Sequence, residues 1–170
     1  MRDCEETLIL LSIGSNIGLR EAYISSAVTM IQESGLIYDI KLSSYYESEP
    51  VGFEEQPWFL NVSLSGKTQL SASELLYFAK SIEYLSGRQK RQRWHERELD
   101  VDIIFFGNHI LNQPNFILPH PAFSNRKFVL MPSAEIAGDT LDPLSNKTIN
   151  TLLNECNDKS VVKLYIAQAS

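Results

Sequence analysis

The alternation of hydrophobic and polar positions divides the first third of the chain into short strands and one amphipathic helix. Residues 7–13 form an apolar, β-branched run that ends at Gly14-Ser15-Asn16, which predicts a strand and a turn. The apolar spacing then changes to three and four residues, which predicts a helix ending near Gly35, with a stripe made by Leu19, Tyr23, Ala27, Met30 and Ile31. Residues 36–46 predict a second strand, and residues 50–57 a loop.

The pattern continues with a strand, a helix and a further strand. Residues 59–68 alternate, which places Leu60, Val62 and Leu64 on one face and Phe59, Asn61 and Ser63 on the other. Ser71 and Glu74 have capping-box spacing, and the helix that follows should end near Gly87, with a stripe made by Leu75, Phe78, Ala79, Ile82 and Leu85. Residues 99–106 predict a fourth strand.

The order β-α-β-β-α-β predicts an α+β fold, a ferredoxin-like sandwich with its helices on one face of an antiparallel sheet. After Gly107-Asn108, a predicted hairpin turn, the pattern is less regular. It indicates a loop around residues 119–121, short helices over 129–135 and 148–155, and a last strand over 161–166. Without a repeat or an evident linker, residues 1–170 are expected to form a single domain with these C-terminal additions.

Composition narrows the class of protein. A chain of 170 residues buries about 70% of its unfolded surface, enough for a core without disulfides. Net charge is −6 and the pI is near 5.1, which argues against a general nucleic-acid binder. The acidic N-terminus and the lack of an apolar stretch of bilayer length predict a cytoplasmic protein with no membrane partner.

Candidate chemistry is concentrated at the start of the fourth predicted strand. Asp100 and Asp102 share one strand face, about 6.5–7 Å apart, while Val101, Ile103 and Phe105 are expected on the opposite, buried face. Two carboxylates so placed repel each other unless a cation or a proton lies between them. Five cations precede them within ten residues, namely Arg88, Lys90, Arg91, Arg93 and Arg97. The pattern favours Mg²⁺ and a polyanionic ligand, with a surface network of ion pairs as the alternative.

A metal site of this kind does not by itself specify the reaction. Kinases, nucleotidyltransferases and cyclases all use a nucleotide with Mg²⁺. The chain has no Gly-x-x-x-x-Gly-Lys-[Ser/Thr] loop and no protein-kinase signature. The stretch Ser12-Ile13-Gly14-Ser15-Asn16 is explained sufficiently as a turn between a strand and a helix.

Five ordered motifs resemble one enzyme family. They are SIGSNIG, YYESEPVGFEEQPWFLN, IEYLSGR, RWHERELDVDIIFFGN and LPHPAFSNRKFVLMP, and they span residues 8–132. Together they resemble 6-hydroxymethyl-7,8-dihydropterin pyrophosphokinase of folate biosynthesis. The resemblance implies a ferredoxin-like fold, two Mg²⁺ ions bound with ATP, and transfer of pyrophosphate from ATP to the hydroxymethyl group of 6-hydroxymethyl-7,8-dihydropterin, with release of AMP.

The resemblance also implies roles for individual residues. Asp100 and Asp102 match the metal-binding pair and, with Arg88 and Arg97, would form the catalytic set. The residues that would contact ATP are Arg88, Trp94, Arg97, His120 and Arg126, and Trp94 matches the tryptophan of a mobile loop. Those that would contact the pterin are Phe59, Asn61 and Phe128. Glu83 matches a family glutamate, although its carboxylate could simply cap or pair on its own helix.

Two departures from the family pattern leave alternatives open. Phe59 stands where many relatives have tyrosine, so the ring is kept and the hydroxyl is lost. His95-Glu96 replaces a frequent Gly-Pro, which places a carboxylate near the bound phosphates. The alternative is therefore a catalytically weak homologue that binds pterin or nucleotide. A ferredoxin-like RNA-binding module is opposed by the acidic pI and the missing aromatic signature. A monomer is expected, with an oligomer left open.

Overall fold

A computed structural model describes residues 5–50, 56–87 and 96–167. The predicted order of elements is present. It comprises β1 (Thr7–Ser15), α1 (Arg20–Ser34), β2 (Ile37–Leu42), β3 (Tyr46–Ser48), β4 (Phe59–Thr68), α2 (Ala72–Leu85) and β5 (Asp100–Phe106). The C-terminal part adds β6 (Leu111–Gln113), β7 (Phe116–Leu118), a 3-10 turn (Phe123–Asn125), α3 (Lys127–Ala137), α4 (Ile149–Glu155) and β8 (Val162–Leu164). β6, β7 and the 3-10 turn were not predicted.

The main sheet is antiparallel, with the strand order β5-β1-β4-β3-β8, and β2 also pairs with β4. β2 and β3 follow each other along the same edge of β4, so together they occupy one strand position. The order is therefore that of a ferredoxin-like βαββαβ unit, and the predicted fold class is confirmed. The single strand predicted over residues 36–46 is interrupted between β2 and β3, and the second piece extends to Ser48.

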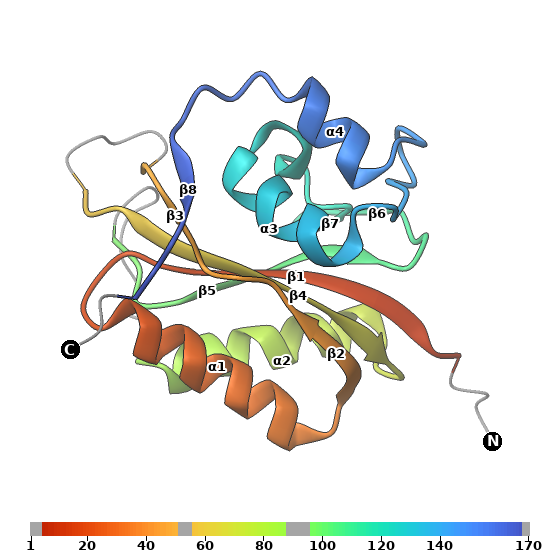
Figure 1. The fold of residues 1–170 in the computed structure, drawn as a ribbon. Helices are drawn as coiled ribbons and strands as arrows, with labels where there is room; N and C mark the ends of the chain where they lie inside the picture. The colour runs from red at the N-terminus through yellow and green to blue at the C-terminus, as the bar shows by residue number, and fades with distance from the viewer. Residues whose placement is uncertain (1–4, 51–55, 88–95, 168–170) are drawn as a thin grey trace.

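Helices cover both faces of the sheet. α1 and α2 lie side by side against one face, and α3 and α4 lie against the other (Figure 1). The expectation of helices on one face holds for the βαββαβ unit alone. The C-terminal additions supply the second layer because the opposite face of β1 and β5 also carries apolar side chains, Leu10 and Ile104 among them, that must be buried.

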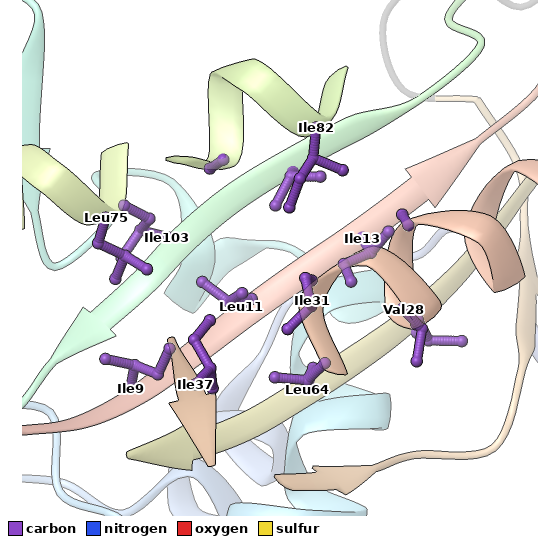
Figure 2. Packing of buried hydrophobic residues seen from close by; sticks show 14 of the residues in the cluster. Ile9, Leu11, Ile13, Val28, Ile31, Ile37, Leu64, Leu75, Ile82 and Ile103 are labelled. Carbon is purple, nitrogen blue, oxygen red and sulfur yellow. The ribbon is translucent and has the colours of Figure 1, made fainter. Parts of the chain in front are cut away.

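The larger core lies between the sheet and the α1/α2 layer. Ile9, Leu11 and Ile13 alternate along β1 toward α1 and α2, and Figure 2 shows Leu11 and Ile13 close to Ile31. Burial of each such side chain contributes about 1.5–3 kcal/mol. Leu10, from the opposite face of the same strand, belongs to a second cluster with residues of α3 and α4. Successive side chains of β1 point to opposite faces of the sheet, so this strand contributes to two cores.

The predicted helix signals are correct in type and partly wrong in detail. Ser71 and Glu74 form both hydrogen bonds of a capping box, and Gly35 ends α1 with a left-handed φ of 65°. Two stripe assignments are wrong, because Leu19 is 78% and Leu85 is 70% exposed. Both lie just at a helix end, where the chain leaves the packed face. The buried stripe of α1 is made by Ile24, Ala27, Val28 and Ile31.

A β-bulge changes the facing of residues in β5. Leu11 pairs with Ile103 but Leu10 pairs with Phe105, so Ile104 is the extra residue. Val101 and Ile103 face the α1/α2 layer as predicted. The assignment of Phe105 to that face is wrong, since it packs in the second cluster, edge-to-face with Phe123 at 4.9 Å between ring centroids.

Gly107 and Asn108 form the predicted turn, but the strand after it does not return along β5. β6 pairs with β7 instead, in a separate two-stranded hairpin. The loop over residues 119–121, both predicted short helices and the last strand are present, with ends that differ by a few residues. Among the described residues, no helix combines the length and apolarity needed to cross a bilayer.

Candidate functional site

A polar row crosses the sheet on the face turned away from α1 and α2. Gly14 pairs with Asp100 on one side and with Asn61 on the other, so these three residues lie side by side on β5, β1 and β4. Strand spacing puts Asp100 and Asn61 about 10 Å apart between Cα atoms. A Cβ on Gly14 would lie 3.0 Å from Asn61 Oδ1, so the glycine gives the amide room to lie across β1.

A second polar row lies beside the first. Ser12 pairs with Asp102 and with Ser63, and the hydroxyl of Ser63 shares a 2.9 Å hydrogen bond with Ser133 of α3. The helix therefore closes this row at its β4 end. Asp102 remains partly exposed at the other end, and we find no ion pair or hydrogen bond for its carboxylate within the described chain.

Asp100 and Arg97 are only loosely paired. Arg97 Nε lies 4.0 Å from Asp100 Oδ1, and its Nη1 donates to the carbonyl of Glu96 at 3.2 Å. The Asp100 side chain is 31% exposed. Asp102 forms no ion pair with an arginine among residues 5–50, 56–87 and 96–167. The four other cations that precede the aspartates lie outside the described residues, so the alternative, a surface network of ion pairs, stays a prediction.

Glu83 of α2 supports the strand between the two aspartates. Its side chain is buried, and Oε1 accepts a 2.8 Å hydrogen bond from the backbone N–H of Val101. It also pairs with Lys80 at 2.9 Å, one turn earlier on the helix. Glu83 therefore pairs on its own helix, as the sequence suggested, and it also bonds to the neighbouring strand. Glu83 fixes the backbone from which Asp100 and Asp102 project.

Asn16 supports the chain around the site, and the sequence interpretation missed this role because it explained the stretch as a turn. Its side chain is fully buried, and Oδ1 accepts a 2.7 Å hydrogen bond from the N–H of Arg97. Nδ2 donates to Gln56 Oε1 at 3.3 Å and to the carbonyl of Pro57 at 3.2 Å. Asn16 thus holds together the chain before β5 and the chain before β4. Only its place in a motif could have indicated this.

A surface cavity of about 320 Å³ adjoins Asp102 at the outer edge of β5. Asp102 and His120 contribute polar groups to it, whereas its walls are largely apolar, including Leu76, Ile103 and Phe116. The His120 N–H donates to the carbonyl of Ile104, which holds the loop against β5. The cavity brings two predicted site residues together with wall residues that were not predicted.

His120 is a neutral hydrogen-bond donor in this setting. Burial lowers the pKa of its imidazole, and nearby Arg126 lowers it further, although Asp102 acts in the opposite direction. Nδ1 accepts a 3.3 Å hydrogen bond from the N–H of Ala122, which assigns the ring proton to Nε2. The second nitrogen is therefore a donor near Asp102.

Asn61 is held in one orientation at the β4 end of the first row. Its side chain is buried, and Nδ2 donates to Ser48 Oγ at 2.9 Å and to the carbonyl of Tyr46 at 3.4 Å. Both amide hydrogens are thus used by β3. The carbonyl Oδ1 is directed over Gly14, where it can accept a hydrogen bond from a ligand.

Phe59 and Phe128, the predicted stacking residues, both have partly exposed rings. Phe59 shares its strand face and lies beside Gly14, with Cδ1 3.9 Å from the position of a Cβ there. Phe128 stands in the first turn of α3, and the Arg126 guanidinium lies 5.8 Å from its ring centroid. Arg126, a predicted ATP residue, therefore lies over the ring of Phe128, a predicted pterin residue. Predicted site residues Arg88 and Trp94 lie outside the described residues.

The two aspartates are the candidate metal ligands of the site. The described residues contain no group of three or more His, Cys, Asp and Glu side chains arranged to hold an ion. Two carboxylates on one strand face remain. Mg²⁺ usually takes only one or two protein carboxylates and completes its shell with water and phosphate oxygens. Asp100 and Asp102 therefore fit a magnesium ion that arrives with a nucleotide.

Comparison with solved structures supports the assigned fold. The crystal structure of Plasmodium falciparum HPPK-DHPS, wild type with pteroate, superposes with a TM-score of 0.69 at 14% identity over 89% of this chain. The present chain spans 42% of the length of that one. At this identity the likeness concerns the fold alone.

Sequence comparison identifies the family. Residues 10–138 match the 7,8-dihydro-6-hydroxymethylpterin-pyrophosphokinase (HPPK) family, and the chain belongs to it. A pyrophosphokinase of that kind from Bacillus subtilis is 41% identical over 126 residues, which cover 74% of this chain and 75% of the relative. One from Haemophilus influenzae is 33% identical over 91% of this chain and 96% of its own length. Family membership confirms the predicted activity, the ATP-dependent transfer of pyrophosphate to hydroxymethyldihydropterin in folate biosynthesis.

Proposed function

We propose that the row formed by Asp100, Gly14 and Asn61 orders the two substrates of this transfer. The triphosphate of ATP would lie at the β5 end and the pterin at the β4 end. The observation that carries the proposal is the shared strand face, which sets a carboxylate and a buried amide about 10 Å apart across a glycine. That span leaves room for the reacting groups between them.

At the β5 end, Asp100 and Asp102 would hold two Mg²⁺ ions through their carboxylates. The bound ions would neutralise phosphate charge and orient the triphosphate. Glu83 would keep the strand backbone in register through its hydrogen bond from Val101. Arg97, with a planar fork that suits phosphate oxygens, would exchange its loose contact with Asp100 for the triphosphate.

The cavity beside β5 would take the base of ATP between its apolar walls. His120 would donate from Nε2 to a phosphate oxygen, a role that suits a neutral imidazole with its proton on that nitrogen. Arg126 would supply positive charge at the far side of the site. Roles for Arg88 and Trp94 at the nucleotide rest on the family motif.

At the β4 end, Asn61 would bind the pterin. Its Oδ1 would accept from a ring N–H, while Ser48 and Tyr46 keep the amide from turning. Phe59 and Phe128 would stack against the flat heterocycle, for which offset aromatic contacts contribute about 0.5–1.5 kcal/mol. Loss of the tyrosine hydroxyl at Phe59 leaves this stacking role intact.

The reaction follows from this alignment. An oxygen lone pair of the pterin hydroxyl forms a bond to the β-phosphorus of ATP. The bond between that phosphorus and the oxygen bridging to the α-phosphate breaks, and its electron pair leaves on AMP. The hydroxyl proton is released. Positioning and charge neutralisation supply most of the rate in such transfers, so the site needs no strong base.

Product identification tests the proposal. With γ-³²P ATP, Mg²⁺ and the reduced pterin, we expect AMP and a labelled pterin diphosphate. Formation of ADP and a pterin monophosphate would overturn the assigned bond. Tight binding of both substrates without turnover would favour the catalytically weak homologue.

The remaining assignments are proposals as well. Residues 1–170 would act as a single domain and a monomer. ATP and the pterin would be its partners in the cytoplasm, without nucleic acid or membrane. A single peak of monomer mass in light scattering, unchanged by added RNA, would support them.

A further inference from the structure

A cluster of four side chains lies at the sheet edge opposite to the aspartates. We call it the Arg20 cluster, and it consists of Arg20, Glu47, Trp58 and Lys163. It joins the first residue of α1 to β3, to the residue before β4 and to the C-terminal strand β8. None of the four is among the site residues that the sequence predicts.

Arg20 is the centre of this cluster. Its Nη1 donates to the backbone carbonyl of Trp58 at 2.6 Å, and its Nη2 donates to Glu47 Oε1 at 2.8 Å. The arginine side chain is 23% exposed and the glutamate 18%, so water screens this pair less than a surface ion pair. A guanidinium holds two acceptors at once in a fixed geometry, which a single ammonium does not.

The carbonyl that Arg20 binds lies directly before β4. It belongs to the peptide group that joins Trp58 to Phe59, the first residue of β4. Fixing this peptide plane fixes the direction in which the Phe59 ring leaves the strand. Phe59 lies beside Gly14, and Asn61 follows two residues later on the same face. Arg20 thus acts at the start of the proposed pterin platform without touching it.

The C-terminal strand β8 contributes Lys163 to the Arg20 cluster. Lys163 Nζ lies 4.8 Å from the centroid of the Trp58 ring and 3.3 Å from Glu47 Oε2. Backbone pairing of β8 with β3 holds the lysine there. Glu49 is tied to the residue just before β8, because its Oε2 accepts from the N–H of Val161 at 2.7 Å. β8 therefore contacts the chain both before and after residues 50–57.

We propose that Arg20 is a positioning residue for the pterin. It acts through the Trp58 carbonyl on Phe59. Glu47, which is itself paired with Lys163, keeps the Arg20 guanidinium in place. The inference rests on the pterin site proposed above. The nucleotide side should be independent of the cluster, because β5 and β3 are separated by β1 and β4 in the sheet.

The test compares Arg20→Gln and Arg20→Lys with the wild-type chain. Lys147→Gln is the matched control, because it removes a 2.6 Å ion pair with Glu155 that lies at neither end of the polar rows. The dissociation constant of the pterin is measured with a non-hydrolysable ATP analogue and Mg²⁺ present, that of the analogue is measured alone, and each Tm is recorded. Since small displacements of a binding group weaken productive binding strongly, Arg20→Gln should raise the pterin constant about tenfold, with analogue binding changed less than about twofold.

Arg20→Lys should recover part of the pterin affinity, because it keeps the charge and one donor. Lys147→Gln should leave both constants unchanged, even if its Tm falls. Unchanged pterin binding in Arg20→Gln, or equal losses for pterin and nucleotide, would overturn the inference. If Arg20→Gln does not fold, Lys163→Met and Glu47→Gln provide the same comparison. A wild-type chain that transfers no pyrophosphate would instead contradict the proposed function, so the two failures are distinguishable.

Discussion

The two ends of the polar rows differ in the charge and the burial of their side chains. At the β5 end stand two carboxylates, and both are partly exposed, Asp102 and Asp100, the latter with 31% of its side chain accessible. At the β4 end, Asn61 is buried and both hydrogens of its amide are directed to β3. A nucleotide binds together with metal ions, and these ions compensate the charge of the carboxylates. A neutral heterocycle brings no ions, so the hydrogen-bonding groups of its site must be held in place before it binds.

The largest effect is expected at the β5 end. Asp102→Asn should lower kcat by about a thousandfold, because interactions with developing phosphate charge are strongest in the transition state. The Tm should stay close to that of the wild type, since the carboxylate is outside the core. Steady-state assays with ATP, pterin and saturating Mg²⁺ measure this.

Asp39→Asn is a suitable control, because that carboxylate is 65% exposed and its ion pair with Lys67 joins β2 to β4 away from the aspartates of β5. Near-normal turnover of Asp102→Asn under these conditions would remove the contrast between the two ends and the metal assignment with it.

A smaller effect, with a different signature, is expected at the β4 end. Asn61→Ala should raise the dissociation constant of the pterin about tenfold to a hundredfold, because an unmade hydrogen bond in a buried site costs about 1–3 kcal/mol. Binding of a non-hydrolysable ATP analogue should be unchanged. Isothermal titration of each ligand separates these results.

Asn154→Ala, at an exposed position of α4, provides the comparison for loss of an amide alone. Weaker nucleotide binding in Asn61→Ala would mean that the two ends are coupled more tightly than their separate hydrogen bonds suggest.

The smallest effect concerns the link between α3 and the strands at the β4 end. Glu135 Oε1 accepts from the N–H and the hydroxyl of Ser44, and Oε2 accepts from the Tyr46 hydroxyl. Burial alone would raise the pKa of the Glu135 carboxyl, but these hydrogen bonds outweigh it and lower the pKa below its ordinary value of 4.5. A lowered pKa in the folded state means that the ionised group stabilises the fold above the unfolded pKa.

Glu135→Gln should therefore lower the free energy of unfolding by less than about 1 kcal/mol at neutral pH, because the group is largely exposed. This difference should disappear as the pH falls below 4.5 and through the folded pKa of the wild type. Urea unfolding at a series of pH values measures it. A difference that persists below the folded pKa, where the carboxyl is protonated in both states, would place the effect in packing and not in ionisation.

Much of the fold followed from local patterns. The period of two in β4 correctly separated Asn61 from Leu60 and Val62, and the Ser71 and Glu74 spacing correctly gave the start of α2. Such features depend on residues within a few positions of each other. The Phe105 error had a different origin. A bulge is set by the register between β1 and β5, and no local pattern records it.

The candidate site also has features that the sequence indicated and features that depend on distant contacts. Motif matching indicated which residues to consider, but it attributed nothing to Asn16, whose contacts reach across 81 positions to Arg97. Glu83 was noted without its contact to Val101, since that hydrogen bond joins a helix to a neighbouring strand edge. The roles of both are positional, and positional roles become visible only when the partners are known.

By itself the sequence determined the element order, the strand face of each aspartate and the family, because alternation, caps and motifs are written in adjacent residues. Only the tertiary structure decided that Asp100, Gly14 and Asn61 form one row, that α3 and α4 cover the second face, and that Arg20 holds the carbonyl before Phe59. These relations depend on strand order and register, which are fixed by contacts between segments far apart in the chain and by the burial that makes those contacts favourable.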